Sequence, residues 1–206
     1  MKMLAIDCAT EACSVALFEG DELIAGELRM LGRGHAEQLV PMISHLPDRG
    51  RAGQISVALG PGSFTGVRIG LAAARALGLA WGARVIGYPT LALIAAMARK
   101  RLGAGPVSTA MRAGHGEWFV QDFGEDGLPQ TSLSSLPPQA AIDTARHVQV
   151  AGTEAEALVA GRGNGTALEL WPDARELKLL PDALFMDNLA PIYGRGPDAH
   201  LPGTTA

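Results

Sequence analysis

A glycine-rich run, Gly60–Gly66, is the first candidate for a binding or catalytic site; it reads Gly-Pro-Gly-Ser-Phe-Thr-Gly. It follows the pattern of a buried strand at Ser56–Leu59 and precedes a helical pattern. Free backbone N–H groups at the start of a helix can hold an anion such as phosphate. The alternative is that the glycines supply turn conformations while Ser63 or Thr65 caps the helix, and we favour this second interpretation.

The same run does not match the common phosphate-binding or nucleophile motifs. A P-loop requires Gly-Lys-Ser/Thr, but here Gly66 is followed by Val67 and Arg68. The third glycine of a dinucleotide fingerprint would fall on Thr65. Ser63 also lacks the flanking residues of a Gly-x-Ser-x-Gly nucleophile elbow. The run therefore predicts neither a Walker-type site nor a hydrolase of this kind.

A second candidate site lies at the end of the first expected strand. Asp7 ends that strand, and Thr10 and Ser14 follow in the turn and in the second strand. In the nucleotide sites of actin-like proteins and sugar kinases, a carboxylate at this place positions metal-bound phosphate and small hydroxyls cradle it. Together with Gly62 and Ser63, these residues are a candidate degenerate nucleotide or anion site. The alternative is that Asp7 only caps a turn, and Asp7 alone does not establish catalysis.

Metal ligands at productive spacing are missing from the sequence. The five histidines form no His-Glu-x-x-His and no His-x-x-x-His pair. Cys8 and Cys13 are the two cysteines, five positions apart in adjoining expected strands, and we expect both to be reduced core residues. The sequence predicts no metal centre and no catalytic residue.

The elements that must position these residues follow from hydrophobic periodicity. The spacing predicts three antiparallel strands and then alternating helices and strands, an order typical of an α/β lobe. The expected strands are Met3–Asp7, Ala12–Phe18, Glu22–Arg29, Ser56–Leu59 and Arg84–Gly87, and the expected helices are His35–Leu46, Thr65–Trp81 and Leu91–Leu102, the last capped by Thr90. Gly103–Pro106 is an expected lobe boundary, which divides the chain into residues 1–102 and 103–206.

The second lobe is expected to be smaller and more polar than the first. Strands are predicted at Val107–Met111 and Glu117–Phe123, and short pieces follow from residue 140 to residue 160. A last helix is predicted at Pro181–Leu189.

The helix expected after the glycine-rich run has a face of small residues. Gly70, Ala74 and Gly78 recur every four positions, so they lie on one side of the helix and allow another helix to approach closely. Arg68 and Arg75 lie close to the same stripe. Two uses of this face stay open: a packing contact within the lobe, which is the commoner use, and an interface between subunits.

Composition describes a globular chain with an uneven distribution of charge. The 206 residues are 48% apolar, which allows a sizeable core, and they carry 17 Lys plus Arg against 21 Asp plus Glu. Residues 49–116 contain nine basic residues and no acidic one, so this stretch is a candidate partner surface. Asp7 interrupts the first apolar run and Pro89 interrupts the longest one, so we expect no signal peptide, no membrane span and a cytoplasmic protein.

Two stretches carry a resemblance to a known family. Residues 4–17, LAIDCATEACSVAL, and residues 60–70, GPGSFTGVRIG, closely resemble the bacterial TsaB family, also called YeaZ. His35–Ile43 and Gly87–Leu91 are also similar to that family, so the resemblance covers the first lobe well and the second weakly. It implies an actin-like two-lobe fold of the sugar-kinase/actin superfamily, with mixed sheets flanked by helices.

The resemblance also implies a function. The chain would be the non-catalytic scaffold that binds a TsaD-like transferase and supports it in making threonylcarbamoyladenosine in tRNA, and it would form a homodimer when alone. A TsaE-like ATPase and tRNA would join through the complex, which uses ATP. This chain would bind no cofactor tightly, and a nucleotide at the partner interface stays open. The interface residues implied are His35, Leu39, Met42, Phe64, Arg68, Gly70, Leu71, Ala74, Arg75 and Gly78.

The family reading also changes the interpretation of the basic stretch. Arg68 and Arg75 become expected contacts to an acidic protein partner. RNA binding stays an open interpretation for the basic residues Arg99, Lys100 and Arg101. We favour the alternative that they stabilise the C-terminal end of a helix.

The chain departs from the family pattern in its second lobe, and other functions stay open. Arg112 stands where an acid is usual, and Gly194 replaces leucine in the ending Pro191–Arg195. An actin-like or sugar-kinase phosphotransferase would use Asp7, Thr10 and the glycine-rich run, and it predicts magnesium-dependent ATP binding. A glycoprotease-like peptidase, an older label for the family, would need a metal or a nucleophile that the sequence does not offer.

Overall fold

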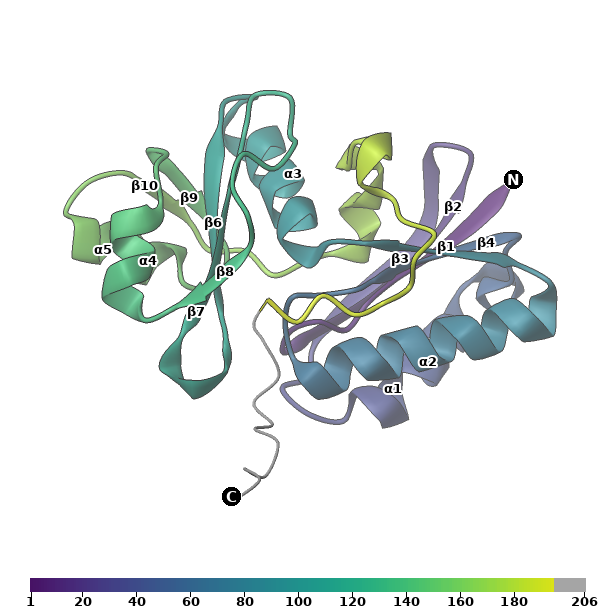
Figure 1. The fold of residues 1–206 in the computed structure, drawn as a ribbon. Helices are drawn as coiled ribbons and strands as arrows, with labels where there is room; N and C mark the ends of the chain where they lie inside the picture. The colour runs from purple at the N-terminus through teal and green to yellow at the C-terminus, as the bar shows by residue number, and fades with distance from the viewer. Residues whose placement is uncertain (195–206) are drawn as a thin grey trace, which may run out of the picture.

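The computed structural model describes residues 1–194 and contains two five-stranded sheets that lie side by side, each flanked by helices (Figure 1). The first sheet has the strand order β3-β2-β1-β4-β5, and the second has the order β10-β9-β6-β7-β8. Both sheets are mixed, because antiparallel strands continue into parallel ones. The expected arrangement of two α/β lobes with mixed sheets is confirmed.

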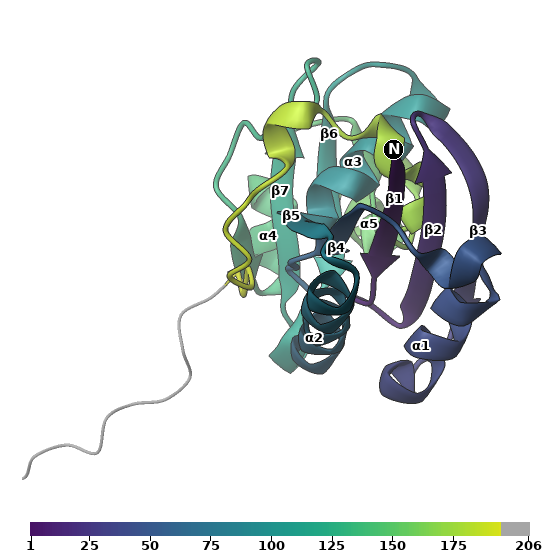
Figure 2. The same cartoon turned by 90° about the vertical axis from the view of Figure 1, so that its right-hand side faces the viewer.

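The first sheet begins with the expected antiparallel meander. Strand β1 pairs with β2 from Lys2 opposite Glu19 to Asp7 opposite Ser14, and β4 and β5 add in parallel beyond β1. Helices α1 and α2 cover one face of this sheet (Figure 2). The elements are β1 (Lys2–Asp7), β2 (Ala12–Glu19), β3 (Glu22–Met30), α1 (His35–His45), the 3-10 turn η1 (Pro47–Gly50), β4 (Gln54–Ala58), α2 (Phe64–Trp81) and β5 (Arg84–Tyr88).

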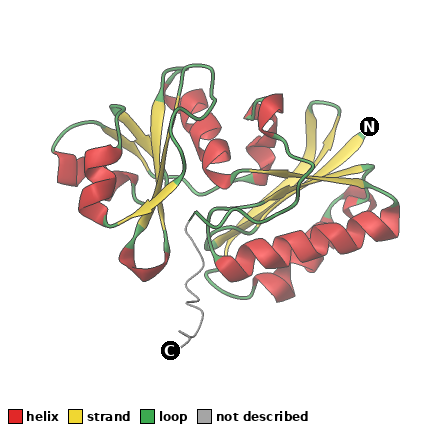
Figure 3. Cartoon of the chain, in the orientation of Figure 1, coloured by secondary structure: helices red, strands yellow, loops and turns green. Residues whose placement is uncertain are grey.

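Helix α3 (Thr90–Leu102) lies between the two sheets (Figure 3) and joins their cores. Its residues are buried without a break from Thr90 to Ala98. The second lobe consists of β6 (Val107–Arg112), η2 (Gly114–Gly116), β7 (Trp118–Phe123), β8 (Ser134–Leu136), α4 (Pro138–Thr144), β9 (Gln149–Ala151), α5 (Ala155–Arg162) and β10 (Thr166–Leu168). The predicted strands at the start of this lobe are confirmed.

The chain then returns to the first lobe. The 3-10 turn η3 (Ala174–Leu179) packs on β1, β2 and β3, and η4 (Asp182–Leu184) follows. Residues 185–193, which we name the C-terminal strap, run along β5 and α2. Because α3 and the strap both pack across the expected boundary, the division into residues 1–102 and 103–206 stays a prediction.

The prediction of a helix at Pro181–Leu189 is wrong. Only Asp182–Leu184 form a short 3-10 turn. The backbone N–H of Met186 donates to the carbonyl of Gly87 at 2.9 Å and its carbonyl accepts from the Gly87 N–H at 2.8 Å. Pairing with the edge of the first sheet therefore replaces the hydrogen bonds that a helix would make.

Three smaller expectations can be compared with the structure. Ser63 caps α2, since its hydroxyl accepts from the N–H of Gly66 at 3.2 Å, as predicted. Pro89 rather than Thr90 is the N-cap of α3. Cys8 and Cys13 are buried free thiols, as expected. Within the part of the chain that the structure describes, no helix is long and apolar enough to cross a membrane.

Candidate functional site

Asp7 lies at the end of β1, where the interior of the lobe surrounds it completely. Its Oδ1 atom accepts from the N–H of Ala9 at 2.9 Å, and its Oδ2 atom lies 3.2 Å from the hydroxyl of Tyr88, which also lies 3.0 Å from the carbonyl of Ile6. Burial removes the hydration of the charged form and raises the pKa of Asp7 to about 7, against the effect of these hydrogen bonds, and the nearby charge of Asp173 adds to the rise. The carboxyl group is engaged by its own chain.

The hydroxyl groups near Asp7 also bond to the chain itself. The Ser14 hydroxyl donates to the carbonyl of Pro172 at 3.4 Å and accepts from the N–H of Ala174 at 2.9 Å. The Thr10 hydroxyl accepts from the N–H of Ala12 at 3.2 Å. These contacts favour the turn-capping alternative for this group of residues, and the degenerate nucleotide or anion site stays a prediction.

The glycine-rich turn packs directly on the turn between β1 and β2. A Cβ atom at Gly62 would overlap the carbonyl of Ala9, and one at Gly66 would overlap the carbonyl of Cys8. The N–H of Ser63 donates to the carbonyl of Ala9 at 2.7 Å. Glycine is therefore required here because two backbone segments touch, and this close approach accounts for the run without a ligand.

The small-residue face of α2 points into its own lobe. Gly70 lies against Cys8 and Val57, and a Cβ atom at Gly78 would come 2.5 Å from Cγ2 of Val85. The other implied interface residues that the structure buries in this way are His35, Leu39, Met42, Leu71 and Ala74. The structure thus favours the packing contact within the lobe for all seven positions, and a partner would meet other side chains of the two helices.

The outer face of α2 carries a different set of small and apolar residues. Thr65, Ala72, Ala76 and Leu79 are all exposed and fall within about 60° of one another at about 100° per residue. Leu79 is 88% exposed, and Val40 on the neighbouring helix α1 is 56% exposed. Sequence reasoning missed this face because two stripes of small residues on one helix look alike until the sheet is placed.

The arginines of α2 bind the C-terminal strap rather than standing free. Arg68 donates to the hydroxyl of Tyr193 at 3.0 Å, and Arg75 donates to the carbonyl of Leu189 at 3.2 Å. Arg84 of β5 forms an ion pair of 2.6 Å with Asp187. The chain itself thus engages Arg68 and Arg75 through a hydroxyl and a carbonyl group, and their contact with an acidic protein partner stays a prediction.

The basic end of α3 is also engaged within the chain. Lys100 forms an ion pair of 2.8 Å with Glu176, and Arg101 lies 3.6 Å from the same carboxylate. Arg99 donates to the carbonyl of Gly105 at 3.3 Å. These contacts support the structural alternative for the three residues.

Arg112, which departs from the family pattern, connects the two lobes. Its Nε atom donates to Glu154 at 2.8 Å, and a second nitrogen lies 3.7 Å from Glu11 in the turn after β1. Glu154 raises the pKa of Arg112 through this hydrogen bond. Two carboxylates therefore hold the guanidinium at the junction of the lobes.

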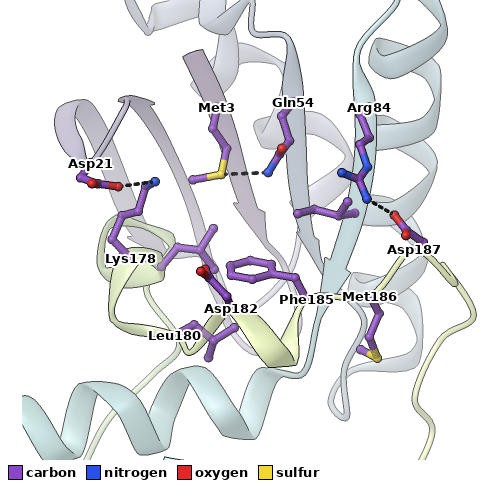
Figure 4. A pocket seen from close by; sticks show the side chains of 12 residues that line it. Met3, Asp21, Gln54, Arg84, Lys178, Leu180, Asp182, Phe185, Met186 and Asp187 are labelled. Atoms are coloured by element: carbon purple, nitrogen blue, oxygen red, sulfur yellow. Dashed lines mark hydrogen bonds and ion pairs between the residues drawn. The ribbon is translucent and has the colours of Figure 1, made fainter. Parts of the chain in front are cut away.

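A pocket of about 420 Å³ lies on the face of the first sheet opposite α1 and α2 (Figure 4). Met3, Ile86 and Phe185 are among its apolar lining residues. Lys178 pairs with Asp21 at 3.0 Å on one side of its rim. Arg84 and Asp187, which also line the pocket, form a second ion pair, and Asp7 is not among the lining residues.

Two arrangements that catalytic sites commonly use, a cluster of metal ligands and a Ser–His pair at Ser108 and His147, are not formed in the described part of the chain. No group of three or more His, Cys, Asp or Glu side chains among residues 1–194 could hold a metal ion. Ser108 is buried and donates to Asp122 at 2.5 Å, while the ring of His147 bonds to Gln130 at 2.9 Å. This arrangement does not make the Ser–His pair that a serine nucleophile needs.

Two mixed-sheet lobes, with helix α3 between them, define an actin-like protein. The solved structure of ethanolamine utilization protein EutJ from Carboxydothermus hydrogenoformans supports the fold alone, with a TM-score of 0.52 at 11% identity over 88% of this chain and 90% of that one. YeaZ from Pseudomonas aeruginosa matches with a TM-score of 0.79 at 28% identity over 93% of this chain and 99% of that one. The expected actin-like two-lobe fold is confirmed.

Sequence comparisons identify the family. The model of the TsaD family, described as tRNA N6-adenosine threonylcarbamoyltransferase, matches residues 29–177. The tRNA threonylcarbamoyladenosine biosynthesis protein TsaB of Escherichia coli K12 is 33% identical over 180 residues, which are 84% of this chain and 74% of that protein. The chain belongs to the TsaB (YeaZ) family, and the resemblance of its two motifs is confirmed.

Proposed function

We propose that the chain is a non-catalytic scaffold subunit of the complex that installs threonylcarbamoyl on adenosine of tRNA, working in the cytoplasm by binding a TsaD-like transferase. Family membership supports the pathway, because the relative from Escherichia coli is named for threonylcarbamoyladenosine biosynthesis. The observation that carries the binding role is the outer face of α2, where the small or apolar residues Thr65, Ala72, Ala76 and Leu79 are exposed. Val40 on the neighbouring helix α1 is exposed as well.

The chemistry of this face suits a partner helix. Ala72 and Ala76 project little from α2, so a second helix can lie close to its backbone. Leu79 is 88% exposed, and burying a leucine side chain stabilises a complex by about 2 kcal/mol. The match of this chain to the TsaD family model means that a TsaD-like partner has a related first lobe and can offer equivalent helices. Pairing of two related lobes through the same helices would also account for a homodimer when the partner is absent.

The arrangement around Asp7 favours a non-catalytic role for this chain. Its carboxyl is fully buried and bonded to Ala9 and Tyr88, so it is not free to position a metal-bound phosphate. In this proposal a TsaE-like ATPase and the tRNA join through the assembled complex, which uses ATP. This chain binds no cofactor tightly on its own, and any nucleotide would sit where it meets its partner.

The test is to mix the purified chain with the TsaD-like subunit of the same organism and to follow complex formation by sizing chromatography and calorimetry. A single earlier-eluting peak is expected at micromolar concentration. Leu79→Asp should weaken the complex by at least about thirtyfold, because a charge replaces the most exposed apolar side chain of the face.

Val148→Asp is the matched control, since Val148 is 66% exposed in the second lobe. It introduces the same charge on a different surface and should bind as the unaltered chain does. Two separate peaks for the unaltered chain and the TsaD-like subunit would contradict the proposal. Equal weakening by both variants would place the interface elsewhere.

A further inference from the structure

The C-terminal strap ends at three exposed side chains that hold one another in place. The guanidinium carbon of Arg68 lies 3.5 Å from the ring centroid of Phe64 and 5.8 Å from that of Tyr193. Nε and one terminal nitrogen of Arg68 donate to the Tyr193 hydroxyl at 3.3 and 3.0 Å. The two ring centroids are 5.6 Å apart. We name these three residues the aromatic–arginine cluster.

The cluster is ordered by mutual contacts and is nevertheless open to solvent. Phe64 is 55% exposed and Tyr193 is 41% exposed. Apolar ring surface in water is unfavourable, and burying it is a large source of binding free energy. Tyrosine and arginine are enriched among the residues that dominate protein interfaces. Since Arg68 already fixes both rings, a partner would lose little free energy in ordering them.

The strap reaches this position through contacts that do not involve the cluster. Asp187 binds Arg84 at 2.6 Å, and the N–H of Ile192 donates to the carbonyl of Leu59 at 2.7 Å. A Cβ atom on Gly60 would come 2.7 Å from the carbonyl oxygen of Ile192, so glycine allows the strap to approach this closely. The strap therefore delivers Tyr193 to the start of α2.

We propose that the aromatic–arginine cluster is the anchor of the partner interface, and that the strap assembles this anchor by supplying Tyr193. The inference rests on the proposed function and names where its binding energy is concentrated. Arg68 and Leu79 are eleven positions apart, which returns to within about 20° of the same side of the helix. A partner helix laid along the outer face of α2 thus meets Arg68 and the rings beside it.

The chemistry of the cluster selects a protein partner with acidic and apolar side chains. Helix α2 carries Arg68 and Arg75 and no acidic residue, so a carboxylate on the partner would be favourable. RNA is a poorer match, because the guanidinium of Arg68 already covers a face of Phe64 on which a base could stack. Neither α2 nor the strap contains a lysine for phosphate contacts.

The experiment measures the affinity of the full chain for the TsaD-like subunit by calorimetry. Phe64→Ala and Tyr193→Ala should each weaken binding by about thirtyfold, and Tyr193→Phe, which keeps the ring and loses the hydroxyl bonded to Arg68, by less. Met30→Ala is the control, because Met30 is similarly exposed but lies on β3, and it should stay within about threefold. Circular dichroism and melting curves check that each variant is folded.

The outcomes separate this inference from the proposal on which it rests. If Leu79→Asp abolishes pairing while Phe64→Ala and Tyr193→Ala bind within about threefold of the unaltered chain, the anchor is wrong and the proposed function stands. If the unaltered chain does not bind the TsaD-like subunit, both the anchor and the proposed function are wrong. If pairing by the cluster variants is unchanged but filter binding shows that their complexes lose tRNA, the cluster contacts RNA and the protein anchor is overturned.

Discussion

Replacing Asp7 by Asn should make the chain more stable at neutral and alkaline pH. Burial raises the pKa of the Asp7 carboxyl from 3.8 to about 7, so the group keeps its proton in the folded chain well above the pH at which it loses it when unfolded. An amide reproduces the protonated acid: Oδ1 accepts from the N–H of Ala9, and the amide nitrogen donates to the hydroxyl of Tyr88. That hydroxyl then donates to the carbonyl of Ile6.

The size of the effect follows from the two pKa values. The folded state binds the Asp7 proton more tightly than the unfolded state, so the free energy of unfolding falls as the pH rises from about 4 and levels off above about 7. Each pH unit within that window corresponds to about 1.4 kcal/mol. Between pH 5 and pH 8 the unaltered chain should therefore lose about 2 to 3 kcal/mol through this one group, and Asp7→Asn should lose none of it.

The assay is urea unfolding followed by tryptophan fluorescence at pH 5, 6, 7 and 8. The advantage of Asp7→Asn should grow by about 2 to 3 kcal/mol across this range, because every other titrating group is common to both chains and cancels. Asp48→Asn is the control: Asp48 is an exposed acid whose pKa is lowered by its hydrogen bond with Lys2, so it should give no such gain. Curves for Asp7→Asn and the unaltered chain that stay parallel within about 0.5 kcal/mol would refute the reasoning.

Four further outcomes can be measured. Gly66→Ala should lower the free energy of unfolding by about 3 kcal/mol or more, because its Cβ would overlap the carbonyl of Cys8, and an unchanged denaturation midpoint would contradict this. Thr90→Val should raise that free energy by about 1 kcal/mol, because the buried Thr90 hydroxyl has no hydrogen-bond partner among residues 1–194. Thr109→Val should lower it, since the Thr109 hydroxyl donates to the carbonyl of Gln121; the same sign for both threonines would be the contrary result. Calorimetry of the isolated chain with magnesium and ATP should show no heat of binding, whereas micromolar affinity would revive the phosphotransferase hypothesis.

Local periodicity predicted most of the elements because the apolar residues that form them are close in sequence. The strands β1, β2 and β3 and the helices α1, α2 and α3 begin and end within a few residues of the expected positions. Pro181–Leu189 was predicted as a helix because Gly87, the pairing partner of Met186, lies about 100 residues earlier in the chain. No local pattern contains that contact.

The sequence predicted which residues lie at the candidate site, but it did not predict which way the small-residue face of α2 points. Asp7 and Ser63 lie where the motifs suggested, and Ser63 caps α2 as predicted. The stripe of Gly70, Ala74 and Gly78 fits a sheet as well as a partner helix, and only the folded chain shows that the sheet takes it. The contact of Arg68 with Tyr193 joins residues 125 positions apart, which spacing cannot reveal.

The pairing of Met186 with β5 has a consequence for how the protein is made. Strand β5 ends at Tyr88 and is the edge of the first sheet, so a nascent chain leaves that edge bare until Met186 has emerged from the ribosome. Translation at about 5 to 20 residues per second makes this interval about 5 to 20 s. An uncovered strand edge is a template for wrong pairing, and chaperones are well placed to shield it during that time. Since Tyr193 follows Met186, the anchor that we propose is complete only after Tyr193 has been synthesised, and products that terminate before it would be left out of the complex.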